Sequence, residues 1–574
     1  MKTKNLPRNT RNSPGAARGA NREIPLPTPK FSGLRFTKGG IVAISILIFL
    51  ICSKMFAVTN YVWQGSPAPV PPFTNWNTAA LTIQEAVDSS NPGDLVLVTN
   101  GIYASGATPT SGSLVSNRVL ISKAINVKSV NGPDVTIIAG ESCNGTNGAG
   151  AVRGVYLENG GQITGFTVSN GHTHIIGDWL DNRSGGGAAI FTSGTISECV
   201  FINNSAHNYG GGVFGYDNSL ISDSMFNNNS ARYGGGVNVM YDGIIRSCQF
   251  FGNSAIRGGG VYLFTDCIAE WCYAEGNVAY DGGGIYCQEG TSQWCVVVNN
   301  TATNGGGIFS YRDSLMRNCF VFNNSAYNAG GGVMCWQGCE VESCTVVQNY
   351  SDSVGGVYIL NYAGTTCIVE NTIAYFNGNG NMTTNPVSTF FSHCCTYPIV
   401  AGTGIITNDP EFLNPGRENF HLSPDSLCRN AGLNKAWQFS AIDLDDTDRI
   451  EAGTVDIGAY EIGRLICSFD AEPLYGFAPL QVQFNGMISG TNTADVFFFW
   501  DFQNDGTQDL SGAWLDAPQF VYSNYRIYSV ALVVSNSLGE TSRDEEPGYI
   551  DVVPEGGIML LTLSASLWLL RNRH

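Results

Sequence analysis

The sequence repeats with a period of about 24 residues through its middle third. Clusters of glycine end at the same point of successive repeats, and the gaps between these points are 25, 24, 24, 24, 23, 25 and 24 residues. The glycines that end the clusters are Gly187, Gly212, Gly236, Gly260, Gly284, Gly307, Gly332 and Gly356. A unit this short cannot bury its own apolar face and has to stack on copies of itself. The repeat therefore predicts a solenoid.

Each position of the repeat keeps its chemical character. The residue after the glycine is mostly β-branched and the residue two further on mostly apolar, the alternation of a short strand with one buried face. A cysteine follows at about the twelfth position, and an asparagine, whose amide can donate to and accept from its neighbour in a stack, at about the seventeenth. The two columns are Cys199, Cys248, Cys272, Cys295, Cys319 and Cys344, and Asn204, Asn229, Asn253, Asn277, Asn300, Asn324 and Asn349. They predict a parallel β-helix.

Length and charge limit what else the chain can be. Its 574 residues leave room for two or three domains. The net charge is −18, but residues 1–57 contribute +9, so the remainder carries −27. An acidic body cannot neutralise phosphates, which argues against nucleic acid as a partner. The cysteines leave two readings open, because export permits disulfides, whereas stacked thiols in a β-helix are more often small apolar fillers.

Both ends of the chain predict processing signals. Residues 1–57 combine a basic start, an apolar run over 41–52 and an expected cleavage site at 55–57, the pattern of a secretory signal peptide. An uncleaved anchor is the alternative, although the run is short for a span. Residues 554–574 combine Pro554-Glu555, an apolar stretch and a basic finish. This end resembles PEP-CTERM sorting signals, which implies recognition by sorting machinery; a plain hydrophobic tail is the alternative.

Two further resemblances cover most of the chain. The coils resemble the pectate-lyase-like superfamily of β-helices, and their Phe-x-x-Asn units are also similar to repeats of polymorphic outer-membrane autotransporter passengers. From Asn371 onward, motifs such as Asp409-Pro410 and the segment 456–461 resemble the choice-of-anchor Q module, which is known for closing bacterial surface β-helices. Residues 466–553, with Trp500-Asp501-Phe502, are similar to PKD domains, which act as spacers or weak carbohydrate-binding modules.

Together these patterns predict an all-β protein, in which a right-handed parallel β-helix is followed by a small Ig-like (PKD) β-sandwich. The expected segments are a signal peptide at 1–57, a linker at 58–74, the parallel β-helix with an N-terminal cap at 75–400, a closing module of the β-helix at 401–465, the PKD-like sandwich at 466–553, and a sorting or anchor segment at 554–574.

An aromatic stripe is the first candidate site. Two residues after the glycine, aromatic side chains stand between inward-facing positions, so we expect their rings to point outward and to lie exposed. Stacked exposed rings would form a platform for sugars; ordinary stacking between coils is the alternative. The stripe is Phe214, Tyr262, Tyr286, Phe309 and Tyr358.

An acidic column is the second candidate. Five or six residues after the glycine, carboxylates follow the first strand, where they would bind Ca²⁺ between coils; the alternative is that aspartate is simply a good turn residue. The column is Asp217, Asp242, Asp266, Glu289 and Asp313. No other cofactor is indicated.

The sequence favours a secreted protein of the bacterial cell surface, outer membrane or extracellular space. We expect a non-catalytic monomer that serves adhesion or binds a polysaccharide or cell-surface glycan. The alternative is a polysaccharide-degrading enzyme, either a pectate-lyase-like lyase or a glycoside hydrolase, whose catalytic residues the sequence does not identify. A groove that gathers two or more carboxylates with an Arg or His would favour the enzyme.

Overall fold

The computed structural model of the protein describes residues 57–554, apart from 363, 384–387, 451–452, 464, 491–492, 514 and 537–539. The expected signal peptide (except Ala57) and the expected sorting segment (except Pro554) lie outside the described residues. Within that range, no helix has both the length and the hydropathy needed to cross a membrane.

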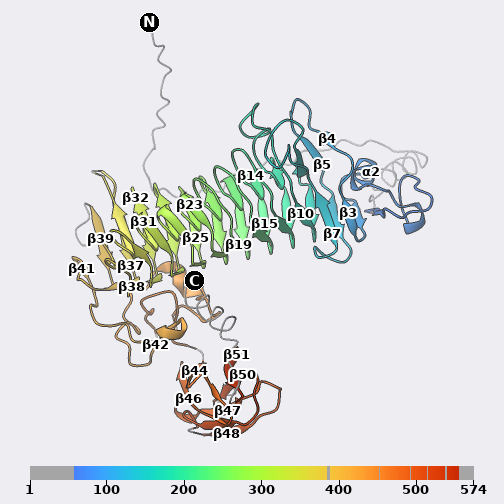
Figure 1. Cartoon of the computed structure of the whole chain (residues 1–574). Helices are drawn as coiled ribbons and strands as arrows, with labels where there is room; N and C mark the ends of the chain where they lie inside the picture. The colour runs from blue at the N-terminus through green and yellow to red at the C-terminus, as the bar shows by residue number, and fades with distance from the viewer. Residues whose placement is uncertain are drawn as a thin grey trace, which may run out of the picture. The chain divides into compact units, whose positions relative to one another are not determined.

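Four parallel sheets wind around one interior and form a parallel β-helix (Figure 1). Sheet I is β1 (Thr59–Val62), β2 (Leu95–Val98), β6 (Asn126–Ser129), β9 (Gln162–Thr164), β12 (Thr195–Ser197), β15 (Leu220–Ser222), β18 (Ile244–Arg246), β21 (Ile268–Glu270), β25 (Thr291–Gln293), β29 (Leu315–Arg317), β33 (Glu340–Glu342), β37 (Cys367–Glu370), β39 (Thr389–Ser392) and β41 (Gly402–Thr403). Sheet II is β3 (Gly101–Tyr103), β7 (Thr136–Ala139), β10 (Thr167–Ser169), β13 (Val200–Ile202), β16 (Met225–Asn227), β19 (Gln249–Phe251), β22 (Tyr273–Glu275), β26 (Val296–Val298), β30 (Phe320–Phe322), β34 (Thr345–Val347), β38 (Ile373–Tyr375) and β40 (Cys395–Thr396).

The other two sheets complete each coil. Sheet III is β4 (Thr108–Pro109), β5 (Ser116–Ile121), β8 (Val152–Leu157), β11 (Ala188–Ile190), β14 (Val213–Asp217), β17 (Val237–Tyr241), β20 (Val261–Leu263), β24 (Ile285–Gln288), β28 (Ile308–Tyr311), β32 (Val333–Trp336) and β36 (Val357–Leu360). Sheet IV is β23 (Val278–Asp281), β27 (Thr301–Asn304), β31 (Ser325–Ala329) and β35 (Tyr350–Ser351). All pairings in the four sheets are parallel except β4 with β5, an arrangement consistent with the expected right-handed coil.

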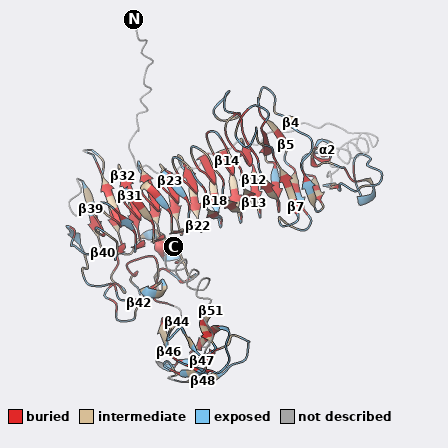
Figure 2. Ribbon diagram, in the orientation of Figure 1, coloured by how far each residue is buried: buried red, intermediate tan, exposed pale blue. Residues whose placement is uncertain are grey.

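Equivalent side chains lie directly above one another, as the repeat predicted. Ile196, Ile221 and Ile245 are partners in register, and the Phe201 and Phe226 rings stack with centroids 5.1 Å apart. The buried residues form one continuous core along the coils, visible as red strands in Figure 2. The cysteine column belongs to this core, and burial raises the pKa of the Cys248 thiol to about 12. All cysteines of the described residues carry free thiols in the structure.

The asparagine column forms a continuous hydrogen-bonded ladder inside the coils. The side-chain amide of Asn229 donates to Asn253 Oδ1 at 3.0 Å and to the Phe201 carbonyl at 3.0 Å. The same Asn253 oxygen accepts from the Asn229 backbone N–H at 2.9 Å. Buried polar groups are tolerated where every partner is present, so the ladder fixes the corner of each coil.

The first coil begins earlier than the sequence predicted. Residues 58–74, expected as a linker, contain β1, which pairs with β2 as the first strand of sheet I. At the expected N-terminal cap lies α2 (Ile83–Ser89), preceded by the short 3-10 helix η1 (Trp76–Thr78). Thr82 and Glu85 form a capping box at the start of α2, which explains why the helix starts at Ile83.

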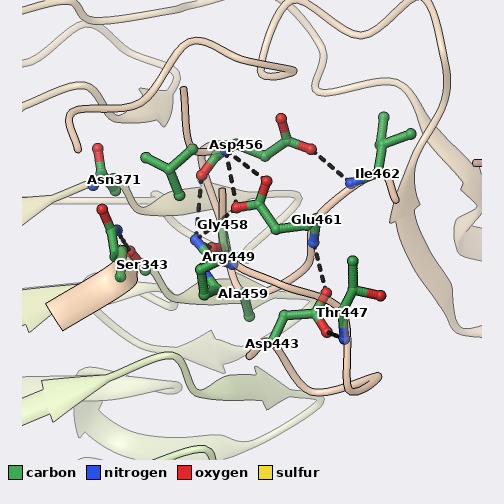
Figure 3. A network of polar contacts seen from close by, with 12 residues as sticks. Ser343, Asn371, Asp443, Thr447, Arg449, Asp456, Gly458, Ala459, Glu461 and Ile462 are labelled. Atoms are coloured by element: carbon green, nitrogen blue, oxygen red, sulfur yellow. Dashed lines mark hydrogen bonds and ion pairs between the residues drawn. The ribbon is translucent and has the colours of Figure 1, made fainter. Parts of the chain in front are cut away.

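The segment after the last coil is held by buried charges. It contains β42 (Phe412–Asn414), η2 (Pro415–Arg417), β43 (Asn419–Leu422) and η3 (Ala436–Ser440). Arg449 is fully buried, 3.3 Å from Glu461, and donates to the Gly458 carbonyl at 3.0 Å (Figure 3). Asp443 accepts from the Glu461 backbone N–H at 2.8 Å. Residues of the motifs that resemble the choice-of-anchor Q module thus form the buried polar contacts that stabilise this segment.

The last described segment is a separate two-sheet sandwich with its own core. One sheet is β44 (Ile466–Glu472), β46 (Leu480–Ser489) and β49 (Gln519–Tyr522); the other is β45 (Tyr475–Phe477), β51 (Thr541–Val553), β50 (Ile527–Ser535), β47 (Phe497–Asp501) and β48 (Leu510–Ala513), with η4 (Thr493–Asp495) before β47. Trp500 is fully buried between the sheets, and its indole N–H donates to the Leu515 carbonyl at 2.8 Å.

Candidate functional site

The expected aromatic stripe lies on the outer face of sheet III. Its members are partners in register, and the rings of Tyr262, Tyr286 and Phe309 stack with centroids 4.9 and 5.0 Å apart. Asn238 and Met334 occupy the same column and interrupt it. The side chains belong to clusters separate from the interior core, so they do point out of the coil.

The expected exposure of these rings is wrong for four of the five. Phe214, Tyr262, Tyr286 and Phe309 are only 0, 5, 2 and 1% exposed, and Tyr358 is half-buried. The reason is that outward-facing residues alternate along a strand, so each ring lies between flanking columns that cover it. Burial raises the pKa of the Tyr262 and Tyr286 hydroxyls, which stay protonated. The stripe is a buried layer and not a platform.

A second layer of rings covers the stripe and reaches solvent. We call it the outer aromatic strip: Phe191, Tyr209, Tyr216, Tyr233, Tyr241, Phe264, Tyr311, Trp336 and Tyr362, all half-buried or exposed. The strip was not predicted from the sequence, although the sequence carries a periodic signal for it. Five of its members follow the repeat glycine by four residues: Phe191, Tyr216, Phe264, Tyr311 and Trp336. Residues two and four positions after the glycine face the same side of the strand, so both columns point outward.

Neighbouring rings of the strip contact one another in two runs and in one further pair, Tyr209 and Tyr233, whose ring centroids are 5.2 Å apart. In the first, Tyr216 lies 6.3 Å from Phe191 and 5.4 Å from Tyr241, which lies 5.7 Å from Phe264. In the second, Trp336 lies 5.5 Å from Tyr311 and 6.3 Å from Tyr362. The coil that carries Gln288 separates the two runs. The strip is therefore a surface that extends over several coils.

Polar side chains lie beside the rings. Arg257 is 3.4 Å from Asp281 and lies over the Tyr286 ring at 5.3 Å. The Tyr262 hydroxyl hydrogen-bonds to Gln288 Oε1 at 3.1 Å. Arg312 lies over the Tyr311 ring at 4.9 Å. A ligand on the strip would meet apolar faces in its middle and hydrogen-bonding groups along its side.

The acidic column lies at the corner between sheets III and I. Asp242, Asp266, Glu289 and Asp313 have φ angles of 52, 59, 56 and 48°, the left-handed turn conformation that aspartate tolerates; in the coil of Asp217 the next residue, Asn218, has it. No three His, Cys, Asp or Glu side chains in the described parts of the chain lie close enough to hold a metal ion. Because Ca²⁺ takes six to eight oxygen ligands, single carboxylates on successive coils do not fit it well.

Carboxylates do gather with basic groups at one place on sheet I. Glu342 lies 2.9 Å from Arg317 and 4.0 Å from Lys435, which also pairs with Glu370. Trp437 covers this cluster, with the Arg317 guanidinium 4.4 Å from its ring, and Gln438 donates to Ser343 at 3.1 Å. The carboxylate side chains are only 8 and 14% exposed. The charged groups are paired with one another and lie beneath Trp437, so they connect the segment around η3 to the coils.

Comparisons with known proteins leave the family open. No family model matches the chain, and no curated protein matches it. Among solved structures, the chain is similar to one described as the crystal structure of pectate lyase Pel9A, with 13% sequence identity and a TM-score of 0.39, over 71% of this chain and 97% of that chain. A likeness at this level carries no argument about activity, and the assignment of a parallel β-helix rests on the strand pairings of this chain.

Proposed function

We propose that the protein is an exported, non-catalytic β-helix that binds a polysaccharide or a cell-surface glycan along the outer aromatic strip. The observation that supports this most is that rings of the strip contact one another across successive coils, on both sides of the coil that carries Gln288. Rings partly exposed in a row match a ligand that is itself an extended repeat, and apolar patches of this kind are typical of binding surfaces.

The chemistry of the strip suits sugar rings. Aromatic faces pack against apolar C–H faces, while tyrosine hydroxyls add hydrogen bonds. Gln288, Arg257 and Arg312 lie beside the rings and supply donors and acceptors for hydroxyl groups. The inner rings beneath are buried and hold the outer ones in place.

The charge of the chain favours a neutral glycan. The chain carries a net charge of −27 beyond residue 57. It therefore repels polyanions that come within the electrostatic screening length of the solution. A polymer of uronic acids would need bridging cations, and the acidic column does not gather its carboxylates into a cation site.

A polysaccharide-degrading enzyme remains the second candidate, favoured by the cluster of Glu342, Glu370, Arg317 and Lys435. A lyase would need a basic group free to abstract a proton and a carboxylate-bound cation beside it. In this cluster Lys435 is engaged by two carboxylates, and Trp437 lies over Arg317. We therefore prefer the binding role.

Export and surface display belong to the proposal as well. They are supported by the resemblance of residues 1–57 to a signal peptide and of 554–574 to PEP-CTERM signals, while the resemblances to choice-of-anchor Q and PKD modules fit a protein displayed on a bacterial surface. In this proposal the sandwich of residues 466–553 spaces a monomeric β-helix from its point of attachment.

The test is glycan binding by the full-length chain and by a Tyr311→Ala/Trp336→Ala double variant. We expect wild type to bind at least one neutral polysaccharide on a glycan array, and the double variant to lose about tenfold in affinity or more, because each stacked ring contributes roughly 0.5–1.5 kcal/mol.

Tyr327→Ala is the matched control, because this exposed tyrosine lies on sheet IV, away from the strip; it should bind like wild type. Release of unsaturated sugars from polyuronates, with Ca²⁺ added, is measured alongside. Unsaturated products, or equal loss in the control, would contradict the proposal.

A further inference from the structure

A polar cavity lies apart from the strip, where the chain leaves sheet II. Its volume is about 370 Å³, within the roughly 300–1,000 Å³ of small-molecule sites. Two consecutive coils form its floor, through Asn203 and Ser205 after β13 and through Asn228 and Ser230 after β16. The loop between β7 and β8 forms a wall. The cavity opens to solvent past the exposed side chains of Asn203 and Asn228.

The wall is fixed by hydrogen bonds. Asn147 donates to Ser205 Oγ at 2.9 Å, and its Oδ1 accepts from the Thr173 backbone N–H at 2.9 Å. The tip of the loop is a tight turn in which Cys143 and Thr146 exchange backbone hydrogen bonds of 2.8 and 3.1 Å. Ser230 Oγ in turn donates to Ser205 Oγ at 3.0 Å. A site held this way exists before its ligand arrives, which lowers the entropy lost on binding.

The lining is polar and uncharged. None of the residues that surround the cavity is Asp, Glu, Lys or Arg; they are amides, hydroxyls, glycine and the imidazole of His172. His172 is buried, and its Nδ1 lies 3.0 Å from the Asn170 carbonyl. A carbonyl only accepts, so Nδ1 donates to it. A charged ligand would find no counter-charge here and would lose water without compensation.

Two amides in the cavity are unused. The side chains of Asn203 and Asn228 make no hydrogen bond to any of the described residues, whereas in the equivalent corner further along the coils Asn323 donates to Asn299 at 2.7 Å and Asn299 to Glu275 at 3.1 Å. The side-chain amides of Asn299 and Asn323 are therefore engaged by neighbouring side chains, whereas those of Asn203 and Asn228 face the cavity without a partner among the described residues.

We propose that this cavity binds one neutral sugar residue, as a second site that does not depend on the aromatic strip. Each sugar hydroxyl both donates and accepts, and the open amides and the serine hydroxyls offer partners of both kinds. The size and the absence of charge select a neutral residue over a uronic acid.

The test uses the full-length chain and an Asn203→Gly/Asn228→Gly double variant. Both positions have left-handed φ angles, 56 and 52°, so glycine removes the amides and keeps the backbone. The probes are D-glucose, D-galactose, D-mannose and N-acetyl-D-glucosamine, with D-galacturonate for comparison. Binding of each sugar is measured by saturation-transfer NMR. We expect at least one neutral sugar to bind wild type, and its affinity to fall fivefold or more in the double variant.

Asn323→Gly, at a φ of 51°, is the matched control and should bind like wild type. The loss caused by Asn203→Gly/Asn228→Gly should be the same when these changes are made in the Tyr311→Ala/Trp336→Ala background, so failure at the strip and failure at the cavity are separable. The proposal is overturned if none of the four neutral sugars binds, if the glycine variant binds as well as wild type, or if galacturonate binds equally well.

Discussion

At the residue scale, the asparagine ladder shows how one side chain can hold several coils. Asn253 Oδ1 accepts from both the backbone and the side chain of Asn229, and its amide donates to Asn277 at 2.9 Å and to the Phe226 carbonyl at 2.8 Å. Four groups depend on it, all buried. An unmet buried group costs about 1–3 kcal/mol.

Replacing Asn253 with alanine should therefore reduce the free energy of unfolding by about 3 kcal/mol or more, because its partners stay buried and cannot all reach water. Urea denaturation followed by circular dichroism measures it. Asn218→Gly is the control: Asn218 is an exposed asparagine with a left-handed φ of 47°, and its change should be within about 0.5 kcal/mol. A similar small loss for Asn253→Ala would mean that the ladder does not contribute to stability.

At the scale of the elements, glycine marks the corner that precedes each strand of sheet III from β11 to β36. A Cβ at Gly236 would lie 2.6 Å from the Gly260 carbonyl oxygen of the next coil and 2.8 Å from the Phe250 ring. The backbone of one coil passes directly over the backbone of the next, and neither can yield. This explains why the glycine clusters set the period of the repeat.

Gly236→Ala should destabilise the protein by more than about 1 kcal/mol, since β17 would have to move away from β20. Gly276→Asn is the contrasting change, because Gly276 has a φ of +64°, has open space around its Cβ position, and occupies the column of Asn203 and Asn228. Melting temperatures of both variants compare them. Equal melting temperatures would show that the corner can relax.

Much of the structure of the elements was predictable from the sequence, because stacked coils need residues of the same kind at equivalent positions. The strand positions, the cysteine core and the asparagine ladder all follow from columns of like residues. The burial of Tyr286 did not follow, since it depends on which neighbouring columns reach over it. Trp294 illustrates the other limit: its indole N–H donates to the Ile442 carbonyl, 148 residues away, and no periodic pattern encodes such a contact.

At the scale of the whole molecule, the acids buried in the segment after the last coil couple stability to pH. Loss of water raises the pKa of Glu461 to about 9, although Arg449 opposes the shift, and burial also raises the pKa of Asp443 and of Asp456. Arg449 is paired with Glu461, and the nearby charges of Asp456 and Asp443 raise the pKa of Glu461 further, so retaining a proton on Glu461 relieves the repulsion among the three carboxyl groups.

A folded-state pKa above the unfolded value means that the folded protein binds the proton more tightly. The resulting stability is present below about pH 4.5 and is lost as the pH rises toward 9. We expect the melting temperature to fall over this range in wild type, and to fall less steeply in Glu461→Gln, which cannot lose a proton there. Parallel pH profiles for the two proteins would show that Glu461 is ionised throughout.

The stacking of near-identical coils has a consequence for how such a protein can change. Each turn of the chain touches mainly the turns on either side, so a duplicated or deleted block of one full period would join cleanly, and the product would be a longer or shorter version of the same scaffold. A one-residue shift inside a strand would instead turn the side chains of that strand to the opposite face, whereas the turns absorb differences of one residue, since the repeats measure 23 to 25 residues. The length of the β-helix, and with it the number of ligand units that it spans, can therefore change in steps of one coil, about 4.8 Å each.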